Sequence, residues 1–289
     1  MAADLDALRA RAFDGEELLR AAVRLNDIES LSVLAAQVTP EDWRAGWQRT
    51  LIPRARTAEA LRTLIDCGAI IDAVDDHGED ALDHALETFD RRFEAEESRF
   101  CDLLLSFGMP VERNGGDRLR TVAERLNPGA AAWLLKRSQP VSPDLLNQCL
   151  NVVAEEVHCS GDFKMPEIRE LLRLLVANGA NPNAPDALGY LPLYHAGFGS
   201  AWLENHSVEV LEDLLLLGAD PLARGREGWT ALDMLLYEAA PGWTDQLFVE
   251  QDSIERITWA ERFIEECPNS KFVPAFRILT DATRRRLQP

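Results

Sequence analysis

The chain has 289 residues, 46% of them hydrophobic, and a formal net charge of −19 at pH 7. Such a negative surface repels nucleic-acid phosphates, which excludes direct DNA or RNA binding and favours a basic protein partner. The same carboxylates would also serve simply to keep a large surface soluble. No run approaches the roughly 18 apolar residues that span a bilayer, and the N-terminus resembles no signal peptide, so we expect a cytoplasmic protein without membrane contact.

The cysteines are odd in number and scattered, and no Cys-x-x-Cys pair occurs. This pattern predicts reduced thiols rather than a disulfide framework. Cys67 and Cys101 fall inside apolar helical runs and are expected in the core. The others are Cys149, Cys159 and Cys267.

The N-terminal part, residues 1–57, is predicted to be a helical cap followed by a degenerate repeat. Thr39-Pro40-Glu41-Asp42 has the residues of a helix start, with a capping hydroxyl, a proline and acids in the first turn. Trp43 and Trp47 are four residues apart, so we expect both on one face of that helix, packed in the core.

A glycine phrase then recurs three times along the chain. Each copy has an apolar helical run that ends at Gly-Ala, with a second glycine ten residues after the first. The first glycine suits the left-handed residue that ends a helix, and the second suits a tight turn into the next helix. A repeat at this spacing predicts a solenoid whose units pack on their neighbours. The glycine pairs are Gly68 and Gly78, Gly179 and Gly189, and Gly218 and Gly228.

These segments resemble ankyrin repeats, whose unit has a β-turn, an inner helix opening Gly-x-Thr-Pro-Leu-His-x-Ala, and an outer helix ending Leu-Leu-x-x-Gly-Ala. The best copy runs from Leu171-Leu172 to Gly179-Ala180 and continues with Gly189, Pro192, Leu193 and Ala196. The resemblance implies an all-α, ankyrin-repeat-like solenoid of helix-turn-helix units with β-turn fingers. It covers residues 58–265, is degenerate around 113–164, and leaves 266–289 as a C-terminal capping helix.

The chain departs from the family in two respects. The family's histidine is replaced by Asp83, Tyr194 and Asp233. The connections between inner and outer helices are also long, over 87–99, 197–207 and 239–253. Because long loops are often functional, these insertions form a second candidate surface.

Signatures of catalysis are absent: no phosphate loop, nucleophile elbow or zinc-binding helix occurs. His158 and Cys159 lie close to several acids, but adjacent residues on a helix point about 100° apart, so a helix-end loop is the preferred interpretation. A second cluster holds Asp75, Asp76, His77, Asp80, Asp83 and His84, for which capping and solvation are preferred over metal ligation. We therefore predict no enzyme, and no catalytic, cofactor-binding or metal-binding residues.

The resemblance implies that a partner binds the concave face made by fingers and inner helices. The residue after each turn glycine should point toward that face, and large aromatic side chains there concentrate binding energy. Trp202 and Trp243 are expected at one edge of the solenoid, in the long insertions. The predicted protein-binding residues are Asp76, His77, Glu79, Asp186, Tyr190, Tyr194, Trp202, Arg224, Arg226, Trp229 and Trp243.

The sequence thus predicts a protein-protein binding module, either a monomer or part of a 1:1 heterocomplex. Its acidity and degenerate repeats suit an immunity or antitoxin-type inhibitor that blocks a basic toxin or effector. An intracellular scaffold or regulatory adaptor with several partners is the alternative. An enzyme that uses the His158–Cys159 region is the third hypothesis and the least favoured.

Overall fold

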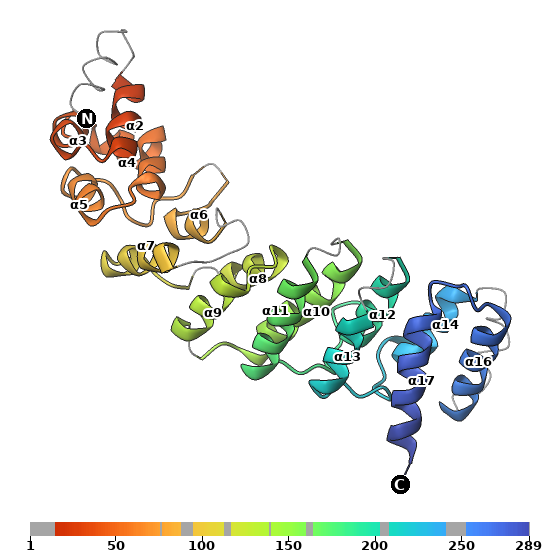
Figure 1. Ribbon diagram of the computed structural model, residues 1–289. Helices are drawn as coiled ribbons and strands as arrows, with labels where there is room; N and C mark the ends of the chain where they lie inside the picture. The colour runs from red at the N-terminus through yellow and green to blue at the C-terminus, as the bar shows by residue number, and fades with distance from the viewer. Residues whose placement is uncertain are drawn as a thin grey trace. The chain divides into compact units, whose positions relative to one another are not determined.

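The structure is a computed structural model that describes residues 15–75, 77–87, 95–112, 117–138, 140–159, 164–202, 208–240 and 253–288. The described residues form helices and turns and contain no strand, as the all-α prediction requires (Figure 1). The chain divides into two compact units, residues 1–113 and 114–289, which are described separately.

Unit 1 consists of helices arranged in an inner and an outer row. In the inner row, the 3-10 helix η1 contacts both α2 and α6, while α3 packs on α5 in the outer row. The leucines between the rows are fully buried, including Leu31, Leu51 and Leu61. The elements are α2 (Gly15–Leu25), α3 (Ile28–Ala35), α4 (Pro40–Ala45), η1 (Trp47–Arg54), α5 (Ala58–Asp66), α6 (Ala81–Glu87) and α7 (Ala95–Ser106).

The predicted helix start at Thr39 is confirmed, but the tryptophan pair after it is wrong. The Thr39 hydroxyl accepts from the backbone N–H of Asp42, 3.1 Å away, which caps α4. Gly46 then adopts extended backbone angles, so α4 ends before Trp47, which instead opens η1. Trp43 is buried in the core as expected.

Unit 2 has the same two-row arrangement. The inner row runs α8, α10, α12, α14, and the outer row runs α9, α11, α13, with each helix in contact with the next in its row. The elements are α8 (Asp117–Glu124), α9 (Pro128–Arg137), α10 (Pro143–Cys159), α11 (Met165–Ala177), α12 (Pro192–Trp202), α13 (Val208–Leu216), η3 (Arg226–Gly228), α14 (Ala231–Ala239), α16 (Ser253–Glu266) and α17 (Val273–Leu287).

The outer helices end as the glycine phrase predicts. At the end of α11, Gly179 has φ +106°, and the N–H groups of Gly179 and Ala180 donate to the carbonyls of Val176 and Leu175. This pair of bonds satisfies carbonyls that the helix leaves exposed, and it needs a residue that tolerates positive φ. The same bonds recur after α5 and α13.

The C-terminal helix α17 lies within residues 266–289, the segment for which a capping helix is predicted. It packs against both α13 and α16. Arg284 forms an ion pair with Glu261 of α16, and Arg286 lies 3.6 Å from Asp220, just beyond α13. These arginines therefore join α17 to its neighbours.

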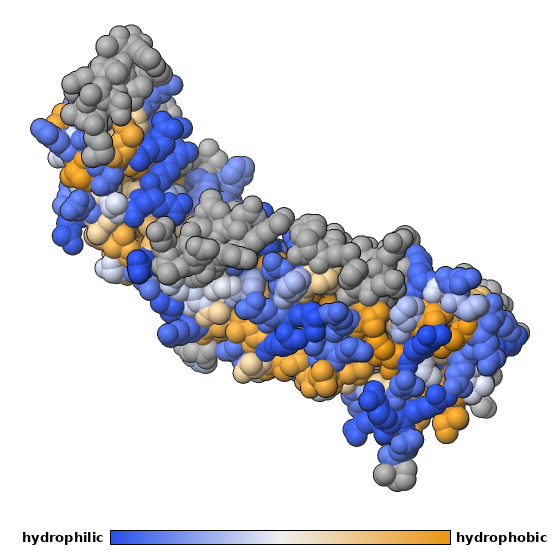
Figure 2. Space-filling model, viewed as in Figure 1, coloured by the Kyte–Doolittle hydropathy of each residue, from blue (hydrophilic) through white to orange (hydrophobic). Residues whose placement is uncertain are grey.

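The visible face is largely hydrophilic, and hydrophobic residues gather on it in several places, among them the region of α11 and α13 (Figure 2). Leu216, the last residue of α13, is 85% exposed. None of the described helices is both long enough and apolar enough to cross a membrane. Cys101 is buried as predicted, whereas Cys67 follows α5 as its C-cap and is partly exposed, which corrects the prediction that it lies in the core.

Candidate protein-binding surface

Three fingers connect outer helices to the next inner helices, and all three have the same backbone hydrogen bonds. In the second finger, the Asp186 N–H donates to the Tyr190 carbonyl at 2.8 Å, and the Gly189 N–H donates to the Asp186 carbonyl at 3.0 Å. The residue after the turn glycine therefore occupies the same place in each finger. The corresponding triplets are Asp75, Gly78 and Glu79 in the first finger, and Gly225, Gly228 and Trp229 in the third.

Asp186, one of the predicted protein-binding residues, holds its finger together. Its Oδ1 accepts from the N–H groups of Leu188 and Tyr190, each at 2.8 Å. Its Oδ2 lies 3.0 Å from Nε2 of His195 on α12. The carboxylate thus fixes both the turn and the attachment of the turn to the inner helix.

Asp75 has the same role in the first finger. Its Oδ1 accepts from the N–H groups of His77 and Glu79, and its Oδ2 lies 2.9 Å from Nε2 of His84 on α6. Burial by itself raises the pKa of the Asp75 carboxyl, but these hydrogen bonds stabilise the ionised form and lower the pKa below its usual value.

The third finger has Gly225 and Met234 where the other two have aspartate and histidine. A Cβ atom on Gly225 would lie 2.4 Å from the Gly189 carbonyl oxygen, so the position admits no side chain. The Arg226 N–H donates to the same oxygen at 2.6 Å. The second and third fingers are therefore in direct backbone contact.

Aromatic rings line the inner helices behind these two fingers. Tyr190 stacks on Tyr194 with 5.0 Å between ring centroids, and Tyr194 stacks on Phe198 at 5.8 Å. Trp229 contacts Tyr237 at 5.5 Å. We call these five residues the aromatic face. Tyr194, one of the predicted protein-binding residues, is only 8% exposed, so it supports Tyr190 and offers little surface of its own.

Two predicted arginines lie at the edge of the aromatic face with different roles. The Arg226 guanidinium lies over the Tyr190 ring, and its Nη1 donates to the Tyr190 hydroxyl at 2.8 Å. Arg224 donates to the Gly228 carbonyl at 2.7 Å and braces its own finger. Both side chains are exposed. Arg226 therefore orients an aromatic ring while it remains reachable from solvent.

Acidic groups also border the aromatic face. Glu227 lies 3.6 Å from Arg226, and Glu238 is exposed on α14. Burial raises the pKa of Tyr194, and the nearby Glu238 and Tyr190 raise it further, so Tyr194 stays protonated. The surface therefore combines apolar rings with both signs of charge.

The aspartates that replace the family's histidine cap the inner helices. In α14, the Thr230 hydroxyl accepts from the Asp233 N–H, and the Asp233 carboxylate accepts from the Thr230 N–H. Asp80 and Asp83 make the same reciprocal pair at the start of α6. Such a capping box satisfies N–H groups that a helix start leaves open.

The remaining predicted residues have mixed outcomes. His77 is exposed and Glu79 partly exposed on the first finger. Trp202 is the last residue of α12, so its placement in a loop is wrong, and its side chain is outside what the structure describes. Asp76 and Trp243 lie outside the described residues, as do the side chains of His158 and Cys159 at the end of α10.

Sequence reasoning missed three exposed or partly exposed members of this surface. Phe198 on α12 and Tyr237 on α14 follow the turn residues Tyr190 and Trp229 by eight residues each. Tyr237 contacts Trp229 directly, and Phe198 is linked to Tyr190 through Tyr194. Leu188, at the tip of the second finger, is 69% exposed. All three could have been identified from their positions in the sequence relative to the turn glycine of their finger.

Neither the family models nor the curated proteins compared with this chain give a match. Solved structures, in contrast, do match this chain. The ankyrin repeat domain of Bcl-3, a member of the IkappaB protein family, is 19% identical, with a TM-score of 0.53 over 74% of this chain and 91% of that one. The human ASB11 ankyrin repeat domain is 20% identical, with a TM-score of 0.50 over 75% and 90%. The chain therefore has the ankyrin-repeat fold.

Proposed function

We propose that the protein binds another protein through the aromatic face of unit 2. The observation that carries this proposal is a pair of aromatic contacts behind two fingers in backbone contact: Tyr190 stacks on Tyr194, and Trp229 packs at a tilt against Tyr237. Rings held in place before binding lose little conformational freedom when a partner docks, so they convert contact area into affinity efficiently.

Leu188 and Arg226 extend this surface onto the finger tips. Leu188 offers an exposed apolar side chain, and Arg226 offers donors beyond its contact with Tyr190. A core of aromatic rings with a polar, charged rim is the composition typical of protein interfaces. The solved structures share the fold, but their sequences are too distant from this one to indicate which partner the chain binds.

The partner we infer is basic. The chain carries a net charge of −19, and Glu227 and Glu238 place negative charge beside the rings. A cationic side chain would gain both from these carboxylates and from the aromatic faces. The finer form of the proposal is an acidic inhibitor of the immunity or antitoxin type that blocks a basic toxin or effector one-to-one.

Affinity capture from the native host tests this proposal when wild type is compared with two matched variants. Trp229→Ala removes a ring of the aromatic face, whereas Trp259→Ala removes a partly buried tryptophan on α16. The proposal expects one basic protein, captured one-to-one, that Trp229→Ala loses and Trp259→Ala retains. Equal capture by both variants would exclude the aromatic face, and several partners lost together would favour the adaptor over the inhibitor.

A further inference from the structure

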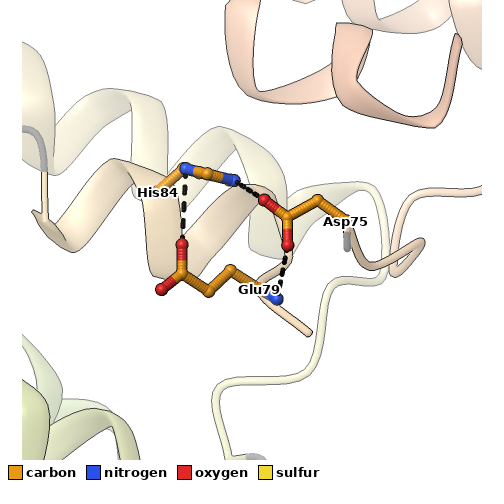
Figure 3. A group of neighbouring side chains, drawn as sticks. All are labelled: Asp75, Glu79 and His84. Carbon is orange, nitrogen blue, oxygen red and sulfur yellow. Dashed lines mark hydrogen bonds and ion pairs between the residues drawn. The ribbon is translucent and has the colours of Figure 1, made fainter. Parts of the chain in front are cut away.

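We propose that the first finger of unit 1 binds a divalent transition-metal ion, with Glu79 and His84 as ligands and Asp75 as the residue that orients the imidazole. Figure 3 shows His84 between the two carboxylates, with one ring nitrogen toward each. Nε2 lies 2.9 Å from Oδ2 of Asp75, and Nδ1 lies 3.8 Å from Oε2 of Glu79. The proposal does not depend on the proposed function.

The contacts of Asp75 support these roles when the His84 imidazole is neutral. Asp75 already accepts two N–H groups of the turn, which favours its ionised form. An ionised carboxylate only accepts, so in neutral His84 the nitrogen that faces Asp75 carries the proton. Nδ1 then presents its lone pair toward Glu79. A carboxylate that holds one ring nitrogen while the other faces a ligand position is the usual arrangement around a metal-bound histidine.

The spacing and access also suit an ion. Bonds from zinc to histidine nitrogen or carboxylate oxygen are about 2.0–2.2 Å long, so an ion fits between atoms 3.8 Å apart with a bent ligand–metal–ligand angle. The side chains of His84 and Glu79 are 32% and 33% exposed, so an ion can reach them from solvent. Water would complete the coordination.

The ligand types and the surrounding charge indicate which ion would bind. Imidazole with carboxylate suits Zn²⁺, Ni²⁺ or Co²⁺, whereas Mg²⁺ and Ca²⁺ prefer oxygen ligands alone. No Lys or Arg occurs between Arg62 and Arg91, a stretch that includes nine Asp or Glu residues. Such a stretch raises the local concentration of cations.

The second finger provides an internal comparison. It has the same aspartate–histidine pair, with Asp186 Oδ2 3.0 Å from His195 Nε2, but Tyr190 takes the place of Glu79. The pair alone is thus part of the finger architecture. Glu79 is the additional group that makes the first finger a ligand site. The variant Glu79→Tyr places at this position the residue type that the equivalent position of the second finger already has, Tyr190.

Calorimetric titration of Zn²⁺ into the chelator-stripped full chain tests the site. All proteins carry Cys267→Ser, because the exposed Cys267 thiol could bind zinc itself. We expect one Zn²⁺ per chain, at least tenfold weaker binding in Glu79→Tyr and in His84→Gln, and unchanged binding in His195→Gln. Circular dichroism establishes that each variant is folded.

Three results would overturn the proposal. The first is the absence of Zn²⁺ binding to the parent protein. The second is equal affinity in the parent and folded Glu79→Tyr, which would place the ion elsewhere. The third is an equal loss in His195→Gln, which would attribute binding to the general architecture of the fingers.

Discussion

At the scale of single residues, Asp213 joins two outer helices of unit 2. It is 5% exposed on α13 and accepts from Nε of Arg169 at 2.6 Å and from Nη2 of Arg173 at 2.7 Å, both on α11. Burial alone raises the pKa of the Asp213 carboxyl, but the two guanidinium groups outweigh burial and lower it. No local sequence pattern predicts this contact between two helices of the same unit.

We expect Asp213→Asn to lower the free energy of unfolding by about 1–3 kcal/mol, because it leaves two arginines with a weaker acceptor. Glu209→Gln is the matched control. Glu209 also pairs with Arg169, but its side chain is 55% exposed, so its loss should cost less than about 1 kcal/mol. Urea unfolding measures both, and equal effects would contradict the assignment.

The same carboxylate predicts a pH dependence. The folded-state pKa of Asp213 lies below its unfolded value of about 3.9, so the unfolded chain binds more protons and stability rises with pH. The contribution is complete above the unfolded pKa and is lost as pH falls through the folded pKa. We expect wild type to lose stability below about pH 4 more steeply than Asp213→Asn, as urea midpoints measured across this range would report. Parallel curves would contradict this account.

At the scale of elements, contact between the second and third fingers depends on Gly225. We expect Gly225→Ala to destabilise unit 2 by about 1–3 kcal/mol, because its Cβ would meet the Gly189 carbonyl oxygen, a backbone atom that cannot turn aside. Gly197→Ala on α12 is the comparison. There the added atom meets the end of the Leu235 side chain, and alanine gains about 1 kcal/mol of helix propensity.

Thermal unfolding followed by circular dichroism distinguishes the two glycine variants. Gly225→Ala should melt well below wild type, and Gly197→Ala should melt closer to it. The reverse order would mean that the helices α12 and α14, rather than the fingers, set the spacing between these two neighbouring repeats of unit 2.

The sequence predicted the repeated elements well because their signals are local. A glycine that ends a helix and a glycine that opens a turn each act through their own backbone. Gly179 and Gly189 therefore set the helix end and the turn of their own repeat, whatever the rest of the chain contains. One error came from the use of spacing alone: Trp47 was placed on α4, but Gly46 ends that helix. The contacts of α17 could not be predicted, because Arg284 and Arg286 pair with Glu261 and Asp220, which no local pattern links to them.

The candidate site was predicted only in part for the same reason. Tyr190 and Trp229 follow from the repeat register, and the structure adds Phe198 and Tyr237 to them. The structural role of Asp186 could not be predicted, because the sequence does not show its hydrogen bonds to the turn and to His195. Asp75 and His84 belong to the acidic cluster noted in the sequence, but their direct contact was not predicted, because His84 lies one residue after the family's histidine position.

At the scale of the whole molecule, the net charge of −19 should govern how a partner is recruited. If the partner is basic, we expect the association rate to fall strongly between low and physiological salt, while dissociation changes little. Stopped-flow or surface-based kinetics with the captured partner measures this. An association rate that is independent of salt would remove the electrostatic part of the proposal and leave the aromatic part intact.

The aromatic face is the central claim, and calorimetric titration of the purified partner into Trp229→Ala tests it most directly. A buried aromatic anchor contributes at least about 2 kcal/mol, so we predict binding weakened by about 30-fold or more. Trp259→Ala should bind as wild type does. Wild-type affinity in Trp229→Ala, with the protein folded, would contradict the account.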